Sequence, residues 1–147
     1  IAMKTLDKAR VNVASNSVGI ARAAFEAAVD YAKQRVQFGR PIAENQAIQF
    51  MLADMSMEIE AARLMYVKAA WLETQGATFT REAAYAKTFC SDMAMRVTAD
   101  VVQVFGGYGY MRDYPVEKYM RDAKINQIWD GTNQIQRIVM ARSILGK

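Results

Sequence analysis

The sequence predicts an all-α fold: an up-and-down four-helix bundle with an additional C-terminal helix, in one domain that covers residues 1–147. Three observations predict it. Apolar residues recur at alternating steps of three and four over long stretches, the helix breakers are few (8 Gly and 2 Pro), and no segment alternates with period two for long enough to form a confident strand. Helices of about 25 to 30 residues that are joined by short turns pack antiparallel, which gives a bundle.

The first two helices are predicted from apolar stripes over residues 11–32 and 48–66. Residues 38–41, Phe-Gly-Arg-Pro, end the first helix, because glycine leaves a helix cheaply and proline disfavours the helical conformation of the residue before it. Gln75 and Gly76 end the second helix with a glycine stop.

The third helix is predicted from a stripe over residues 86–104, with Thr80 as its N-cap and Glu82 in its first turn. The glycine-rich segment 106–110 ends it.

Two shorter helices complete the chain. Pro115 suits the first turn of a fourth helix that reaches about Ile128, and a fifth helix runs from about Thr132 to Leu145.

Composition excludes several classes of chemistry. The chain has no histidine, so it contains no Ser-His-Asp or Cys-His pair and no histidine zinc site, and we expect no metal. Its one cysteine, Cys90, excludes an internal disulfide and lies on an apolar stripe, which favours core packing. The net charge of +4 is scattered, which argues against nucleic acid, and no apolar run approaches the ~18 residues of a membrane span.

Two further patterns have a structural interpretation. Met51 and Met55 lie within a helical stripe, so the ten methionines favour gap-filling core over a pliable binding surface. The glycine-rich segment 106–109 follows a helix, whereas a dinucleotide fingerprint follows a strand. We therefore interpret it as a helix stop whose backbone can approach a ligand closely.

The segment 128–137 is the most informative. Asp130-Gly131 is a strong turn pair between two helical runs, beside the large apolar ring of Trp129. One interpretation is a plain corner in which Thr132 or Asp130 caps the last helix. The other is a carboxylate whose apolar surroundings raise its pKa enough for it to act as a base, next to free N–H groups that suit an anionic ligand.

When segment 128–137 is considered together with other stretches of the chain, the sequence resembles the C-terminal domain of the acyl-CoA dehydrogenases, flavoenzymes that desaturate acyl-CoA thioesters. The likeness lies in residues 6–10, 31–39 with 45–48, 103–109, and 114–124 leading into 130–137, in the family's order and spacing. The resemblance implies that the family's N-terminal helical domain and middle β-domain are absent from this sequence, which begins at Ile1, and that the fragment alone is inactive.

The resemblance also implies a cofactor and partners. FAD would lie between this domain and a neighbouring subunit of a homo-oligomer, a dimer of dimers. The partners would be an acyl-CoA substrate and an electron-transferring flavoprotein or similar acceptor, in a bacterial cytoplasm or a mitochondrial matrix. The positions that match the family's FAD contacts are Arg35, Gln37, Phe38, Gln46, Gln103, Val104, Phe105, Gly106, Gly107, Thr132, Asn133 and Gln134.

Asp130 matches the family's catalytic base, where most members carry Glu, and Ala9 occupies the position of the alternative base in a second lineage. The aspartate is one methylene shorter, about 1.5 Å of reach. The implied reaction is removal of the proton α to the thioester carbonyl with transfer of a β-hydride to the flavin, and the residues expected at the substrate are Asp7, Arg10, Trp129 and Gly131.

Two alternatives stay open on the sequence. The chain could be a helical oligomerisation module of a family member that has lost or altered the base chemistry. It could also be a stand-alone bundle of the cytokine or carrier kind, which predicts a stable monomer indifferent to FAD. The length and branching of the acyl group stay open in every case.

Overall fold

The computed structural model describes residues 2–146. Its elements, in chain order, are α1 (Ala2–Gln34), β1 (Val36–Gln37), β2 (Arg40–Pro41), the 3-10 helix η1 (Ile42–Glu44), α2 (Gln46–Thr74), α3 (Thr80–Phe105), α4 (Gly107–Tyr110), α5 (Val116–Ile125) and α6 (Asn133–Leu145).

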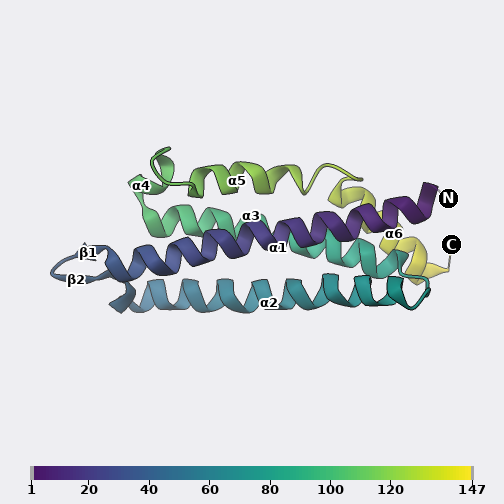
Figure 1. Cartoon of the computed structure of the whole chain (residues 1–147), viewed down its shortest axis with the longest axis horizontal. Coiled ribbons are helices and arrows are strands. Elements are labelled where there is room, and N and C mark those ends of the chain that lie inside the picture. Colours follow the sequence, from purple (N-terminus) through teal and green to yellow (C-terminus); the bar gives the residue numbers. More distant parts are fainter. Residues whose placement is uncertain (1, 147) are drawn as a thin grey trace.

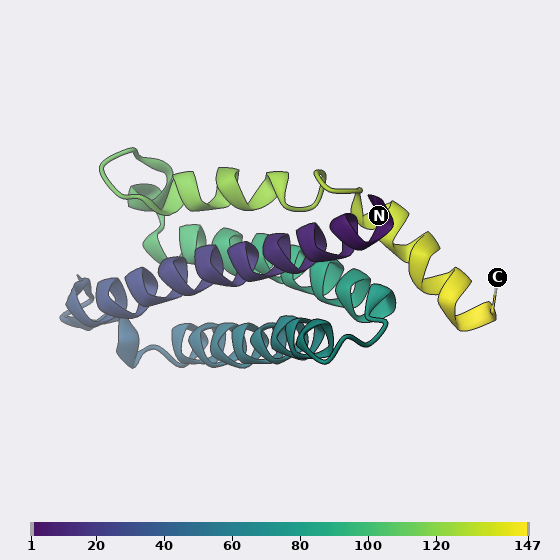
Figure 2. The ribbon, with the colours of Figure 1, turned by 45° about the vertical axis from the view of Figure 1, so that its right-hand side comes forward.

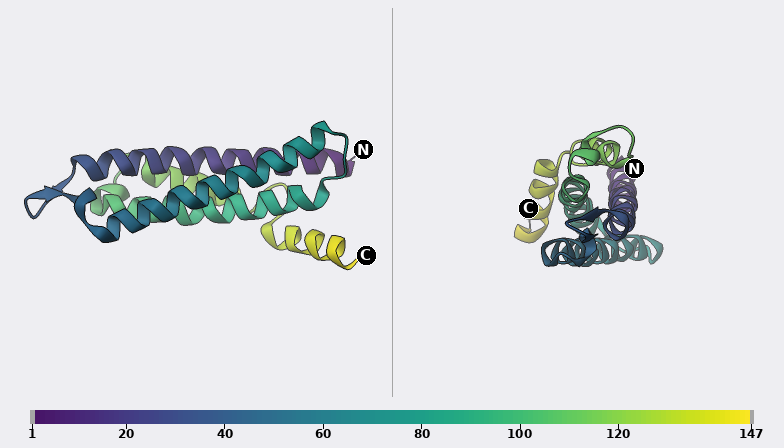
Figure 3. Two further views of the ribbon diagram at one scale, coloured as in Figure 1. Left: turned by 90° about the horizontal axis from the view of Figure 1, so that it is seen from below. Right: turned by 90° about the vertical axis from the view of Figure 1, so that its left-hand side faces the viewer.

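The long helices α1 and α3 run in the same direction at the centre of an up-and-down bundle (Figure 1). Helix α2 packs along one side of this pair and α5 along the other, and both run in the opposite direction. The predicted all-α bundle is confirmed. The additional helix α6 packs on α3 and then turns away from the bundle, at the end where the N-terminus lies (Figure 2). In the view along the bundle, α6 lies outside the other helices (Figure 3).

Small residues bring the two central helices together. On α1, Ala14, Ala21 and Ala28 recur every seventh residue and have no exposed surface. Larger side chains such as Met55 on α2 and Met93 on α3 fill the space around them. The prediction of gap-filling methionines therefore holds for part of them: Met51 also packs against the core, whereas Met57, Met111 and Met120 are exposed.

A hairpin closes the bundle end between α1 and α2. Phe38 and Gly39 have positive φ angles of 52° and 80°, the pattern of a type I′ turn, and β1 pairs antiparallel with β2. The first helix ends at Gln34, a few residues before the predicted stop at residues 38–41, because those residues form the hairpin instead. The two short strands are an addition that residue patterning is too coarse to show.

Two predicted helix ends are wrong. Phe79, not Thr80, is the N-cap of α3, because the Thr80 hydroxyl instead donates a 2.6 Å hydrogen bond to Asp7 Oδ2 on α1. The fourth helix ends at Ile125 rather than near Ile128, and the chain then passes through turns to the start of α6.

Cys90 is fully buried on α3, as predicted, and its thiol donates to the Ala62 carbonyl oxygen at 3.3 Å. Burial raises the pKa of the thiol to about 12, so Cys90 is unreactive in its native place. Within residues 2–146, no helix combines the length and the apolarity that a membrane crossing requires.

Candidate functional site

The corner between α5 and α6 has a specific backbone conformation. Asp130 and Gly131 are consecutive residues with positive φ, 51° and 89°. Aspartate tolerates this left-handed region better than most side chains, and glycine adopts it freely. The side-chain amide of Gln136 donates to the carbonyl oxygens of both residues, at 3.3 and 2.9 Å. The following helix therefore fixes the shape of the corner that presents Asp130.

Asn133 anchors the start of α6 to α3. Its Nδ2 donates to Ser91 Oγ and to Asp92 Oδ1, both at 2.8 Å, and its Oδ1 accepts from Lys87 Nζ at 2.8 Å. Its backbone N–H donates to the Gln127 carbonyl oxygen at 3.0 Å. Every polar atom of the Asn133 side chain thus has a partner, which fixes the helix start in place.

Asp92 forms hydrogen bonds with the segments on both sides of the corner. Its carboxylate accepts from Gln127 at 2.7 Å and from Arg137 at 3.0 Å, in addition to Asn133. Burial by itself would raise the pKa of Asp92, but these three hydrogen bonds outweigh burial and leave the pKa lowered. Asp92 therefore stays ionised and joins the end of α5 to the start of α6.

Lys87 lies beneath this network with no exposed surface. Burial lowers the pKa of its ammonium to about 8; the charges of Asp92 and Asp130 oppose the shift, and Arg10 adds to it. Sequence reasoning missed Lys87, Asp92 and Gln136. The charge content of α3 offered no signal, because its charged share matches the 23% of the whole chain.

The last helix has a side-chain cap. Thr132 Oγ1 accepts from the backbone N–H of Ile135 at 3.3 Å, so of the two predicted caps Thr132 is the one used. In the part of the chain that the structure describes, the backbone N–H of Gly131 has no hydrogen-bond acceptor. The corner therefore presents a free donor next to the Asp130 side chain.

The apolar surroundings expected for Asp130 are not provided by residues 2–146 of a single chain. Asp130 is exposed, and the ring of Trp129 beside it is 46% exposed. The expectation failed because a neighbouring aromatic ring in the sequence does not have to fold over the carboxylate. A water-excluding wall at Asp130 requires a second surface.

Asp7 and Arg10 are each 4% exposed and form an ion pair of 2.7 Å at the N-terminal end of α1. Arg10 Nε is buried without a hydrogen-bond partner. Both side chains lie inside the chain, close enough to the corner for Arg10 to lower the pKa of Lys87. Their contact with a substrate stays a prediction.

A hollow of about 540 Å³ lies at the corner. Its lining residues come from α3, the α5–α6 turns and the start of α6, and they are Asp92, Lys124, Gln127, Ile128, Thr132, Asn133, Gln134 and Arg137. The three FAD positions predicted in this region therefore line one polar hollow.

The remaining FAD positions lie at the opposite end of the bundle, around the hairpin. The Arg35 guanidinium stacks over the Tyr108 ring at 5.1 Å, and Phe38 is fully exposed (102%). Gln37, Gln46, Gln103, Gly106 and Gly107 are exposed as well. A stacked cation for phosphate, an apolar ring and a glycine backbone fit a dinucleotide that carries a flavin.

Val104 and Phe105 are exceptions within this group. Each is 5% exposed, and the Phe105 ring stacks on Tyr31 with ring centres 4.0 Å apart. Their side chains belong to the core, so only their backbone is in a position to meet a cofactor.

The two groups of predicted FAD residues are separated by most of the length of α1 (Figure 1). At 1.5 Å per residue, the helix between Arg10 and Arg35 spans roughly 38 Å. The two predicted groups are therefore too far apart for one flavin to contact both within a single chain.

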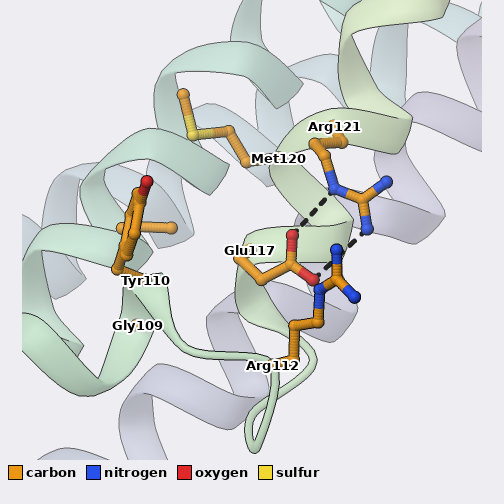
Figure 4. A pocket seen from close by; sticks show the side chains of 7 residues that line it. Gly109, Tyr110, Arg112, Glu117, Met120 and Arg121 are labelled. Atoms are coloured by element: carbon orange, nitrogen blue, oxygen red, sulfur yellow. Dashed lines mark hydrogen bonds and ion pairs between the residues drawn. The ribbon is translucent and has the colours of Figure 1, made fainter.

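Another hollow, of about 460 Å³, lies between α4 and α5 (Figure 4). Arg121 reaches Glu117 there with two hydrogen bonds of 2.8 and 3.2 Å, and Tyr110, Arg112 and Met120 surround them. None of the predicted site residues lines it.

In residues 2–146, no group of three or more His, Cys, Asp or Glu side chains lies close enough together to hold a metal ion.

Comparisons with known proteins identify the family of the chain. The family model described as "Acyl-CoA dehydrogenase, C-terminal domain" matches residues 1–145. An acyl-CoA dehydrogenase of Bacillus subtilis is 55% identical over 99% of this chain and 38% of its own length. A short-chain-specific acyl-CoA dehydrogenase of Megasphaera elsdenii is also 55% identical, over 99% of this chain and 38% of its own length.

Among solved structures, butyryl-CoA dehydrogenase of Megasphaera elsdenii superposes with a TM-score of 0.97 at 55% identity, over 98% of this chain and 38% of that one. A chain in the structure of the electron-transferring flavoprotein of Acidaminococcus fermentans gives 0.98 at 55% identity, over 99% and 38%. The chain thus spans 38% of the length of these relatives. It belongs to the acyl-CoA dehydrogenase family, whose C-terminal domain it matches.

Proposed function

We propose that this chain is the C-terminal domain of an FAD-dependent acyl-CoA dehydrogenase and supplies both the base and part of the flavin site for α,β-desaturation of an acyl-CoA thioester. The observation that carries the proposal is the Asp130 corner, a carboxylate on a backbone that Gln136 and Asn133 hold rigidly beside a polar hollow. The family's other domains would supply the surface that covers Asp130.

Within this domain, each proposed step belongs to a residue of the corner. Asp130 would take the proton α to the thioester carbonyl, and the free N–H of Gly131 would donate to the carbonyl oxygen as charge develops there. Trp129 would form an apolar wall beside the acyl group. When bound, FAD would accept the hydride from the β carbon. Thr132 to Gln134 would line one flavin site, and Arg35 would hold the pyrophosphate of a second FAD, at the opposite end of the bundle.

The short reach of Asp130 bears on the substrate. Because the side chain is one methylene shorter than Glu, about 1.5 Å, the α carbon must lie closer to the corner than it would for a glutamate. Family relatives include enzymes named for short-chain acyl-CoA and, at 49% identity, a cyclohexane-1-carbonyl-CoA dehydrogenase of Geobacter metallireducens. We propose a short or alicyclic acyl group. Those relatives are bacterial, which favours a bacterial cytoplasm over a mitochondrial matrix as the place of action.

We also propose that the chain works as a homo-oligomer that passes its electrons to an electron-transferring flavoprotein or similar acceptor. The opposite placement of the two FAD groups supports the oligomer, because neither group completes a site in one chain. A row of exposed apolar side chains on α2 supports it too: Phe50, Met57, Leu64 and Trp71 recur every seventh residue and are 56–66% exposed.

Anaerobic flavin reduction by butyryl-CoA, in the full-length enzyme that carries this domain, tests the proposal. We expect Asp130→Asn to slow reduction by about 10²- to 10⁴-fold, the usual contribution of a general base. Asp130→Glu, which keeps a carboxylate, should retain measurable reduction. If Asp130→Asn reduces the flavin as fast as the parent, the base assignment is wrong, and the helical oligomerisation module is the function that remains.

A further inference from the structure

Packing alone does not explain Lys87. Its side chain is the largest that the core encloses completely, and it lies on α3 among alanines such as Ala83, Ala84 and Ala86. An unbranched apolar side chain such as methionine would fill similar space without the cost of moving an ammonium group out of water. The groups that its ammonium meets must therefore account for it.

The ammonium meets the helix that follows the Asp130 corner. Lys87 Nζ donates to Asn133 Oδ1 at 2.8 Å. The chemistry of the partners fixes the orientation of this amide: Asp92 only accepts, so it must face the Asn133 nitrogen, and Lys87 only donates, so it must face the oxygen. A charged donor makes this hydrogen bond stronger than a neutral one would be.

Asn133 in turn determines where the corner begins and ends. It is the first residue of α6, directly after the N-cap Thr132, and its backbone N–H ties it to Gln127 before the corner. A change at Lys87 would therefore be transmitted through Asn133 to both ends of the segment that carries Asp130.

Charge links the same two residues. The charged groups that act on the Lys87 ammonium are Asp92 on α3 and Asp130 on the corner, which favour its protonated form, and Arg10 on α1, which opposes it. Arg10 is itself paired with Asp7. Of the two carboxylates, Asp92 is already committed to Gln127, Asn133 and Arg137, whereas no hydrogen bond to the Asp130 carboxylate exists among the described residues.

We propose that Lys87 is a positioning residue for the base: through Asn133 its buried ammonium holds the Asp130 corner in place, and its charge balances the Asp130 carboxylate from beneath. This inference rests on the proposed function and extends it to a residue that never meets the substrate. The consequence is that the rate of proton removal depends on the protonation state of a core lysine.

The test compares Lys87→Met and Lys87→Gln in the full-length enzyme, with Lys118→Met as control because Lys118 is exposed on α5 and pairs with Asp122. Lys87→Met loses both the hydrogen bond and the charge, whereas Lys87→Gln keeps a donor for Asn133. We measure anaerobic flavin reduction by butyryl-CoA between pH 6 and about 9, a range chosen to bracket the pKa of Lys87. Amide exchange of residues 130–136 is followed without substrate.

We expect Lys87→Met to slow reduction by about tenfold to a hundredfold, since a misplacement near 1 Å costs about that much. Amide exchange at the corner should quicken, and the binding of butyryl-CoA should change little. The parent rate should fall above about pH 8, where the ammonium loses its proton, and this fall should be absent from both variants. Lys87→Gln should lie between the parent and Lys87→Met, and it replaces Lys87→Met if that variant does not fold.

A Lys87 variant that keeps the parent's rate, pH dependence and corner exchange overturns the inference. The proposed function has a separate readout, because Asp130→Asn tests the base itself. If Asp130→Asn loses reduction while both Lys87 variants keep the parent's behaviour, Asp130 is the base and Lys87 does not position it.

Discussion

The side-chain amide nitrogen of Gln136 lies 2.7 Å from the point that a Cβ atom on Gly131 would occupy. The same nitrogen donates a 2.9 Å hydrogen bond to the Gly131 carbonyl oxygen. The close approach of helix α6 to the corner, and the hydrogen bond that results from it, therefore both require the absence of a side chain at residue 131.

Gly131→Ala is expected to destabilise the protein for two reasons. An alanine is strained at a φ of 89°, and its Cβ would displace Gln136 from the corner. Gly76 is a matched control, because it has a φ of 67° and a Cβ added there would meet no atom within 4 Å. We expect Gly76→Ala to cost about 1 kcal/mol in urea unfolding and Gly131→Ala about 1–2 kcal/mol more. Equal losses at the two sites would contradict the close approach.

Substitutions at Asp130 should affect stability according to their tolerance of positive φ. Asparagine adopts the left-handed region as readily as aspartate, so Asp130→Asn should leave the free energy of unfolding within about 0.5 kcal/mol of the parent. Asp130→Glu places a longer side chain at a φ of 51° and should cost about 1 kcal/mol. Thermal unfolding measures both. A large loss in Asp130→Asn would mean that the carboxylate has a structural role.

The pKa of Lys87 makes stability depend on pH. The pKa is about 8 in the native protein and 10.5 as the ordinary value, so the unfolded chain binds more protons than the native chain between these values. The free energy of unfolding should then rise with pH in this window, by up to about 3 kcal/mol in all. The Cys90 thiol, with its pKa raised from 9.0 to about 12, works in the opposite direction above pH 9.

Urea unfolding of the parent and of Lys87→Met at pH 7.5, 8.25 and 9, roughly the lower part of that window, isolates the lysine. The parent should gain up to about 1 kcal/mol across this range, and Lys87→Met should not. Because Cys90 is present in both proteins, its contribution cancels in the comparison. Parallel pH dependences in the two proteins would show that Lys87 is protonated throughout.

The sequence predicts the bundle well because apolar periodicity reports directly on which face of a helix is buried. It fails where the outcome depends on contacts between distant segments. Thr80 has the chemistry of an N-cap, yet its hydroxyl donates a hydrogen bond to Asp7, which is 73 residues away in the chain. Asp130 and Gly131 are recognisable as a turn, but Lys87 becomes part of the site only because α6 packs on α3.

The exposed apolar row on α2 predicts self-association with two-fold symmetry. If two copies of α2 cross antiparallel, Phe50 of one copy meets Trp71 of the other, and Met57 meets Leu64, so one row is complementary to itself. Asp54 then lies near Lys68 of the second copy, which adds opposite charges at the rim of the contact.

Met57→Glu should weaken this association at least tenfold, because it places a charge in the middle of the apolar contact. Met111→Glu, the same change at another exposed methionine, is the control. Lys68→Glu alone should also weaken association, and adding Asp54→Lys should restore it by exchanging the charges across the two-fold axis. Sedimentation velocity of the chain over a range of concentrations measures all of these proteins. A parent that stays monomeric, or a Met57→Glu chain that associates as the parent does, would show that the α2 row does not join two copies.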